Sequence, residues 1–294
     1  MLKTIAWPRK KFVPLDVEQS ILPVLLPTKA EFGMMCLQNA HRVEAIRAEC
    51  SRLGLPMDSA LSLRKHHIRK NHKGRNENAL QLGTQKDIAE AAELFEGAIA
   101  AHLTAGGIGF LREDAQRAMN TSTTPSQPDA PKPPSIPTPD FLLTAPMAIE
   151  WPELLEASWT QELRIDSDGV HYTEDEFTLE YRDGGRAWAA AVPRAAHAGG
   201  PLHWVEAKHY YGASTIPMDN RSAVGKLFTV VDKYVSRFGP GAICLGVGCS
   251  EPLAAALEAR GALVLDQSPL DMGAVDEQMR TWCCAARESG ELLP

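Results

Sequence analysis

Residues 138–150 have the sequence TPDFLLTAPMAIE, and residues 203–212 have the sequence HWVEAKHYYG. Both segments set an acidic residue against an apolar run of strand length, Asp140 in the first and Glu206 in the second. Because side chains alternate between the two faces of a strand, Glu206 and Lys208 project from one face, while Val205 and Ala207 point into the core. If the two strands pair as a hairpin, Asp140 lies beside Glu206.

Two carboxylates with a lysine beside them form an oxygen-rich site suited to a hard divalent cation, Mg²⁺ or Mn²⁺. A metal ion bound there lowers the pKa of a coordinated water and withdraws charge from a phosphoryl oxygen. Lys208 would position the attacking hydroxide or stabilise the charge that develops at phosphorus. The spacing of two residues matters because it keeps Glu206 and Lys208 on the same face of the strand.

Two structural alternatives exist for the same three residues. A Glu-x-Lys sequence in a strand is typical of an exposed cross-strand ion pair. Here the charges are flanked by apolar residues, and buried charges are costly unless they are paired or bind a metal. The context therefore favours either a metal site or a buried structural ion pair.

The composition is that of an ordinary globular protein. The chain has 294 residues, of which 44% are apolar and 23% charged, and the length fits one large domain or two modest ones. We expect no membrane contact, because no segment approaches the roughly 18 consecutive apolar residues of a span. We also expect no secretory signal, because the basic start lacks an apolar region behind it.

Several other classes of site are excluded by missing motifs. The six cysteines include no Cys-x-x-Cys pair, so neither a zinc site nor a disulfide scaffold is predicted, and we expect a reducing compartment, nuclear or cytoplasmic. Residues 246–251 begin like a dinucleotide-binding turn but lack its third glycine. There is no phosphate-binding loop with the sequence G-x-x-x-x-G-K-[ST] and no G-x-S-x-G motif.

The net charge of −7 conceals an excess of positive charge near the start of the chain. Residues 1–80 hold 14 Lys and Arg against 7 Asp and Glu, whereas the rest of the chain is strongly acidic. A basic segment of this kind favours contact with nucleic acid phosphates, although a solvated helix face or a localisation signal would look similar. The candidate phosphate contacts are Arg64, Lys65, Arg69, Lys70, Lys73 and Arg75.

The basic cluster lies in a region, residues 1–82, that we expect to be helical. Apolar residues recur at three- and four-residue steps over 29–53, Gly54 and Pro56 end that helix, and Asp58 can cap the next one. Two helices joined by such a turn, with the second one basic, resemble a helix-turn-helix arrangement.

The remainder of the chain predicts an α/β order. The expected elements are a helix at 86–102, strands at 107–111, 140–151 and 201–212, a helix at 221–237, a strand at 242–248, a helix at 251–260 and a strand at 262–266. Two connections are unusually long: a Pro-rich loop at 119–138, and an acidic insertion at 152–200, for which we expect a small hairpin over 177–192.

Three motifs together carry a resemblance to a known family. Thr138-Pro139-Asp140, the sequence WVEAK at 204–208 and the sequence FGPG at 238–241 make the chain similar to the TPD-motif proteins, a branch of the PD-(D/E)XK nuclease superfamily that includes the codanin-interacting nuclease of animals. The resemblance covers roughly residues 87–250, interrupted by the two long connections. It implies a restriction-endonuclease-like core with the order α-β-β-β-α-β and a mixed central sheet at 83–275, followed by a tail at 276–294.

The resemblance also implies roles for individual residues. Asp140 and Glu206 correspond to metal ligands and Lys208 to the catalytic lysine. Glu93 matches the superfamily's additional acidic residue, which would be both a catalytic residue and a metal ligand, with Glu90 and Glu96 as substitutes. Such nucleases often place a polar residue in the following core helix, for which Lys226 and Lys233 are the candidates.

Two functions follow from these patterns. The first is a nuclease that uses Mg²⁺ or Mn²⁺ to hydrolyse phosphodiester bonds in DNA, with RNA or branched structures as further substrates. The second is an adaptor that retains the nuclease fold and binds nucleic acid together with a protein scaffold of the codanin type.

Overall fold

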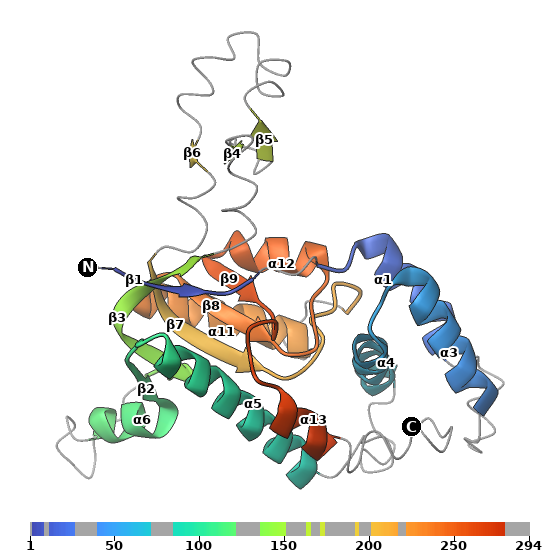
Figure 1. Cartoon of the computed structure of the whole chain (residues 1–294), viewed down its shortest axis with the longest axis horizontal. Coiled ribbons are helices and arrows are strands. Elements are labelled where there is room, and N and C mark those ends of the chain that lie inside the picture. Colours follow the sequence, from blue (N-terminus) through green and yellow to red (C-terminus); the bar gives the residue numbers. More distant parts are fainter. Residues whose placement is uncertain are drawn as a thin grey trace, which may run out of the picture.

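A computed structural model describes residues 2–8, 12–26, 40–71, 85–121, 136–150, 163–165, 171–173, 192–193, 201–216 and 222–279 (Figure 1). The strands are β1 (Lys3–Ala6), β2 (Phe110–Arg112), β3 (Phe141–Glu150), β4 (Leu163–Ile165), β5 (His171–Thr173), β6 (Val192–Pro193), β7 (Leu202–Lys208), β8 (Gly241–Leu245) and β9 (Ala262–Leu265). The helices are α1 (Leu15–Leu25), α3 (Ala40–Leu53), α4 (Met57–Asn71), α5 (Gln85–Ala105), α6 (Glu113–Thr121), α11 (Ala223–Phe238), α12 (Glu251–Glu258) and α13 (Gly273–Met279).

The centre of the fold is a mixed six-stranded sheet. Its strand order is β1-β3-β7-β8-β9, and β2 also pairs with β3. Strand β3 is antiparallel to both β2 and β7, whereas β7, β8 and β9 run parallel to one another. The parallel pairs are joined through α11 and α12, because parallel neighbours need a crossover connection. The prediction of an α/β protein with a mixed sheet is therefore confirmed.

Strand β3 is irregular at its middle. Its pairing with β7 shifts register between Leu142 and Met147, and the three residues 144–146 between two buried stretches are exposed. Pro146 lies in this segment, where its missing N–H costs no ladder hydrogen bond. The irregularity separates the first half of β3, which pairs with β2 and β7, from the second half, which pairs with β1 and meets β7 at Leu202.

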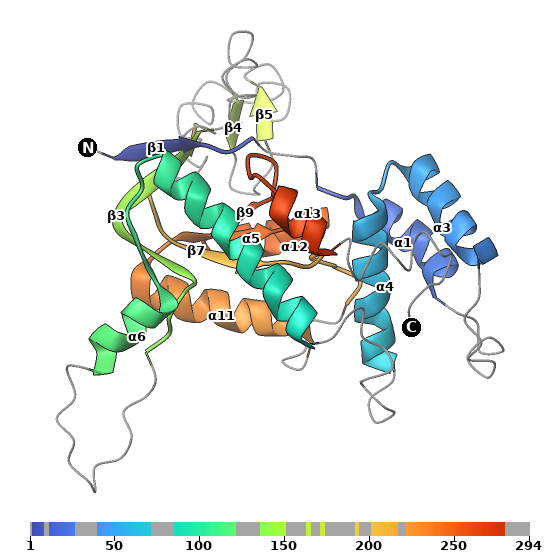
Figure 2. The same ribbon diagram turned by 60° about the horizontal axis from the view of Figure 1, so that its bottom comes forward.

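Helices cover both faces of the sheet (Figures 1 and 2), and each face has its own apolar core. On one face α5 and α13 pack against β3 and against the side chains of Val205 and Ala207. On the other face α11 and α12 share a core with the N-terminal helices and with Trp204 of β7. Successive residues of β7 thus enter opposite cores, as alternation along a strand requires.

The N-terminal region contributes to the central sheet as well as to the helices. Strand β1 pairs parallel with the second half of β3, from Lys3 opposite Met147 to Ala6 opposite Glu150. Val13 forms a further bridge with Ser250. Our expectation of a helical region over 1–82 therefore omitted a strand, and the boundary at residue 82 does not separate two cores among the described residues.

The remaining elements agree closely with the sequence analysis, apart from the following exceptions. The insertion after β3 contains a small antiparallel sheet of strand order β5-β4-β6. The hairpin that we expected over 177–192 lies outside the described residues except for its last position, and so do residues 122–135 of the Pro-rich loop. Helix α6, whose last three residues overlap the start of that loop, was not predicted, and neither was α13, which crosses the expected boundary at residue 275.

One structural finding bears on the expectation that the chain does not contact a membrane. Among the helices that the structure describes, none combines the length and the apolar character needed to cross a bilayer.

Candidate active site

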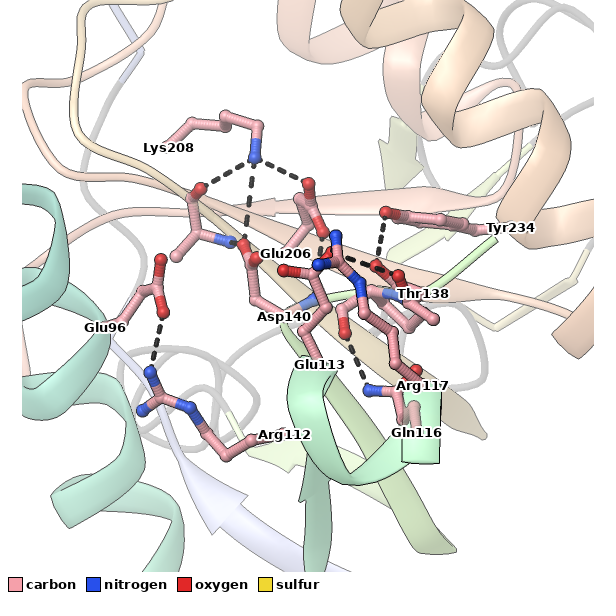
Figure 3. Close-up of polar contacts among 12 residues, drawn as sticks. Glu96, Arg112, Glu113, Gln116, Arg117, Thr138, Asp140, Glu206, Lys208 and Tyr234 are labelled. Carbon is pink, nitrogen blue, oxygen red and sulfur yellow. Dashed lines mark hydrogen bonds and ion pairs between the residues drawn. The ribbon is translucent and has the colours of Figure 1, made fainter. Parts of the chain in front are cut away.

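Antiparallel pairing of β3 with β7 brings Asp140 and Glu206 together. Phe141 lies opposite Val205 in the ladder, so the residues next to them, Asp140 and Glu206, meet at the end of the paired segment. The Asp140 N–H donates to Glu206 Oε2 at 3.1 Å, and the Ala207 N–H donates to Asp140 Oδ2 at 2.8 Å (Figure 3). Each carboxylate is thus held by the backbone of the other strand.

Lys208 completes this arrangement from the same face of β7 as Glu206. Its Nζ donates to Glu206 Oε1 at 2.5 Å and to the carbonyl oxygen of Ala207 at 2.9 Å. The same Nζ lies 3.7 Å from Asp140 Oδ2, so one ammonium group contacts both carboxylates (Figure 3). The structure therefore unites Asp140, Glu206 and Lys208, the three residues that the sequence singled out.

Burial has the largest single effect on the pKa values of Glu206 and Lys208. Glu206 is 5% exposed, and burial raises the pKa of its carboxyl group to about 7, against the opposing effect of Lys208 and with a contribution from Asp140. Burial acts to lower the pKa of Lys208, but the two carboxylates outweigh it and leave that pKa raised. Glu206 therefore titrates near neutral pH beside a lysine that stays charged.

The third carboxylate at the site is Glu96 in α5. Burial and the charge of Asp140 raise the pKa of Glu96, while Arg112 and Lys208 act to lower it. Glu93, the residue that the sequence analysis preferred, is exposed on α5, as is Glu90. The structure therefore brings Glu96 towards Asp140 and Lys208 (Figure 3) and leaves Glu93 outside this group.

Helical phase could have identified Glu96. The core residues of α5 are Ala91, Phe95, Ile99 and Leu103, which recur every four residues. Glu96 adjoins this buried stripe, whereas Glu93 lies on the opposite side of the helix.

Arg112 lies on the outer side of Glu96. Its guanidinium group donates to Glu96 Oε2 at 2.7 Å and lies over the ring of Phe141, with Cζ 5.1 Å from the ring centroid. Arg112 is also the residue opposite Phe141 in the β2–β3 ladder. The sequence analysis did not single out Arg112.

The turn at 138–140 is anchored by α6 and α11. Gln116, which is 4% exposed, donates through Nε2 to the Pro139 carbonyl at 2.7 Å. The Thr138 hydroxyl donates to Glu113 Oε1 at 3.1 Å, and the Tyr234 hydroxyl donates to the Thr138 carbonyl at 3.0 Å. Three side chains from two helices thus fix the backbone immediately before Asp140 (Figure 3).

Tyr234 is the polar residue that α11 contributes to the site. Burial, followed by the charges of Glu206 and Asp140, raises the pKa of its phenol, so the hydroxyl stays protonated and can donate. Lys226 and Lys233, the candidates from the sequence, are both exposed on α11. The apolar neighbours of Tyr234 gave it the pattern of a core residue, which is why the sequence analysis passed over it.

The motifs at 204–208 and 238–241 are in direct contact. Trp204 Nε1 donates to the carbonyl of Gly239 at 2.8 Å, and a Cβ on Gly241 would lie 2.1 Å from the indole ring. Only a glycine at 241 therefore leaves room for Trp204. Because Trp204 and Glu206 share a face of β7, this packing fixes the strand that carries the site.

The segment after Lys208 is bound to the N-terminal helices. The Ser62 hydroxyl of α4 accepts from the Tyr211 N–H at 3.0 Å. His67 lies 3.0 Å from the Thr215 hydroxyl, and the ring of His66 packs against Tyr210 at 5.2 Å. Helix α4 therefore adjoins the strand end that carries the lysine.

Among the six predicted phosphate contacts, the structure describes the side chain of Arg64 alone. Arg64 is 6% exposed and donates through Nε to the carbonyl of Leu25 at 3.0 Å, so it packs inside the helical layer rather than on the surface. Lys65, Arg69 and Lys70 lie in α4, but their side chains are outside the described part of the structure, as are Lys73 and Arg75 altogether. These five stay a prediction.

The donor set suits a hard cation. Asp140 and Glu206 supply carboxylate oxygens, and a cation, the Lys208 ammonium, already bridges them. Mg²⁺ is often held by one or two carboxylates together with water and phosphate oxygens, so two such ligands with Glu96 nearby are sufficient. Within the described ranges no cluster of three or more His, Cys, Asp or Glu side chains is close enough to form a metal cage.

A separate cavity of about 450 Å³ lies beyond His209, the residue that follows Lys208. Its walls come from residues 12–17, the turn between α3 and α4, the turn after β8, the end of β9 and the second half of α13. Asp140, Glu206 and Lys208 do not line it. The cluster of Asp140, Glu206 and Lys208 is therefore distinct from this hollow.

Comparisons with known proteins add no assignment. No protein-family model, no curated protein and no solved structure matches the chain significantly.

Proposed function

We propose that this protein is a metal-dependent nuclease that hydrolyses phosphodiester bonds in DNA. The observation that carries the proposal is the contact between Asp140 and Glu206 across two antiparallel strands, with the Lys208 ammonium touching both. A carboxylate pair can hold a divalent cation, and a neighbouring ammonium group can stabilise the charge that develops at phosphorus, so this arrangement is suited to phosphodiester hydrolysis. RNA and branched nucleic acids are further candidate substrates.

The fold supports the same proposal. The elements α5, β2, β3, β7, α11 and β8 follow one another in the order α-β-β-β-α-β, apart from α6 and the small sheet after β3. This is the order that the resemblance to TPD-motif nucleases implies for a restriction-endonuclease-like core. One fold can host many functions, so the proposed activity rests on the residues of the site, and the fold adds support to it.

Each residue has a distinct role in the proposed reaction. Asp140 and Glu206 would hold Mg²⁺ or Mn²⁺, with Glu96 as a third carboxylate close by. The bound ion would supply Lewis-acid chemistry, lowering the pKa of a water and withdrawing charge from the phosphate. Lys208 would orient the attacking water and stabilise negative charge at phosphorus, and Tyr234 would keep the turn before Asp140 in place.

The experiment compares purified wild type with Asp140→Asn and Lys208→Ala on linear, flapped, hairpin and branched DNA and RNA in Mg²⁺ or Mn²⁺. We expect Asp140→Asn to lose cleavage and metal binding while its circular dichroism spectrum stays native. Lys208→Ala should keep metal binding and lose turnover. Absence of cleavage by wild type on the whole panel, or equal cleavage by Asp140→Asn, would refute the proposal.

A second function, a nuclease-fold adaptor, is favoured by one specific observation. The Lys208 ammonium already contacts both carboxylates, as it would in a structural ion pair. In that case the chain would bind nucleic acid and a protein scaffold without cleavage. Calorimetric titration with Mn²⁺ separates the two functions: heat that disappears in Glu206→Ala favours the nuclease, and no heat from wild type favours the adaptor.

A further inference from the structure

Arg112 occupies a defined place at the edge of the carboxylate cluster. It ends β2 directly opposite Phe141, the neighbour of Asp140, and its guanidinium group rests on the Phe141 ring. The guanidinium group faces Glu96 (Figure 3). Because the side chain is 37% exposed, part of it also reaches solvent. Arg112 is thus a cation held beside the carboxylate cluster by two partners, Glu96 and the ring of Phe141.

Glu96 is shared between two sources of positive charge. On one side Arg112 donates to its Oε2 at 2.7 Å. On the other side it faces Lys208, whose positive charge attracts its carboxylate, and Asp140, whose negative charge repels it (Figure 3). A divalent cation bound by Asp140 and Glu206 would attract Glu96 more strongly than a half-exposed guanidinium group does, because its charge is doubled and its surroundings are more buried.

We propose that Arg112 binds a backbone phosphate of the substrate and that Glu96 is its alternative partner. With Glu96 drawn to the metal ion, the guanidinium group of Arg112 exchanges a carboxylate for the incoming phosphate next to the bond that is cut. This inference rests on the proposed nuclease function and adds one residue of its substrate site.

The chemistry of the side chain fits this exchange. A guanidinium group presents a planar fork of donors that matches carboxylate and phosphate oxygens equally well, so one replaces the other without a change in geometry. Stacking on Phe141 keeps the fork in position while the anion changes. A lysine at this position would keep the charge but lose both the fork and the stacking.

The test uses two measurements that must move in opposite directions. In Arg112→Ala, Mn²⁺ should bind about two- to fivefold more tightly by calorimetry, because the competitor for Glu96 is gone. Binding of a short fluorescein-labelled DNA duplex, measured by anisotropy in Ca²⁺ with product checked to be absent, should weaken about tenfold. The slope of log affinity against log salt should become shallower by about 0.9, the loss of one phosphate contact.

The chain offers a matched control in Arg260. Its guanidinium group pairs with Asp232 at 2.8 Å and lies over Phe228 at 4.5 Å. This is the same combination of a carboxylate and a ring, here supplied by α11 to an arginine in the turn after α12. Arg260→Ala should leave both the Mn²⁺ affinity and the salt slope unchanged. Arg112→Lys should retain the salt slope while losing part of the DNA affinity.

The outcomes distinguish this inference from the function on which it rests. If wild type binds no Mn²⁺, the nuclease proposal fails and the inference fails with it. If wild type binds Mn²⁺ but Arg112→Ala leaves the DNA affinity and the salt slope as they were, only the inference is overturned. It is equally overturned if Arg112→Ala weakens Mn²⁺ binding, which would make Arg112 a support of the metal site.

Discussion

Two buried glutamates, Glu18 and Glu206, show how differently the same side chain can be used in one fold. Glu18 of α1 is 0% exposed and Glu206 of β7 is 5% exposed. The carboxylate of Glu18 accepts hydrogen bonds from Tyr211, Ser214 and Thr215, through two backbone N–H groups and three hydroxyls. Glu206 has one backbone N–H and one lysine, and it faces a second carboxylate.

The difference separates a structural carboxylate from a candidate functional one. Five neutral donors surround Glu18, so its charge is satisfied where it lies and binds the loop after Lys208 to α1. Burial raises the pKa of Glu206 to about 7, and the charge of Asp140 adds to this shift. Buried groups whose pKa is displaced beside a second charge are frequent at functional sites, which supports the proposed role of Glu206.

The largest expected effect is on stability, at Glu18. Glu18→Ala would leave the donors of Tyr211, Ser214 and Thr215 buried without an acceptor, which should lower the free energy of unfolding by about 3–5 kcal/mol. Chemical denaturation measures this loss. Glu18→Gln keeps one acceptor oxygen and should lose less, while the exposed Glu44→Ala should change stability by under about 0.5 kcal/mol. A loss below 1 kcal/mol in Glu18→Ala would break the comparison.

Glu206, by contrast, should lower the stability of the wild-type protein, by an amount that depends on pH. Its folded pKa is raised from 4.5 to about 7, so the carboxyl group ionises less readily in the folded protein than in the unfolded chain. This group therefore destabilises the wild type increasingly as pH rises from about 4.5 to about 7, by up to about 3 kcal/mol.

Glu206→Gln has no such ionisation and serves as the reference. The unfolding free energy of wild type minus that of Glu206→Gln should fall across this pH window and be flat below it. Denaturation curves at several pH values measure the difference. Parallel pH profiles for the two proteins would show that Glu206 is as well satisfied as Glu18.

Metal binding should carry the same pH signature. Because the cation binds the ionised carboxylate, the Mn²⁺ affinity should rise by up to about tenfold per pH unit below about pH 7 and level off above it. Calorimetry in two buffers of different ionisation enthalpy should detect protons released at pH 6 and few at pH 8. An affinity independent of pH would mean that Glu206 is not a ligand.

The smallest expected effect is at Tyr234, which ties α11 to the turn before Asp140. Tyr234→Phe removes the donor to the Thr138 carbonyl but keeps the ring that packs on Trp204, so it should cost about 1 kcal/mol of stability. Cleavage should also slow, because the turn is less firmly placed. Lys233→Ala, an exposed neighbour, should change neither property, and an equal effect in both variants would contradict the assignment.

The pairing of Asp140 with Glu206 was predictable because it depends on local rules. Each lies at the edge of a strand-length apolar run, and alternation along β7 sets Glu206 and Lys208 on one face. For the third carboxylate, the resemblance favours Glu93 with Glu96 as a substitute, whereas the helical phase of α5 points to Glu96, the residue that the structure brings towards Asp140.

Other features could not be predicted from the sequence, because the residues that they contact are distant in the chain. Glu18 looks like an ordinary first-turn acidic residue of α1, and its donors lie near residue 214. Strand β1 has four residues, too few for a pattern, and its partner begins at Met147. Arg64 shares a run with five other basic residues, but only the position of Leu25 reveals that it is buried.

The strand at the start of the chain determines how the protein can be shortened. A polypeptide beginning at residue 83 would leave the N–H and C=O groups of residues 147–150 without the hydrogen bonds that β1 supplies, and it would remove Trp7, whose indole bonds the carbonyl of Asp266. Exposed strand edges of that kind recruit other chains, so such a fragment is expected to precipitate. An inactive fragment would therefore say nothing about the carboxylates, and every measurement of catalysis should be made with residues 1–82 in place.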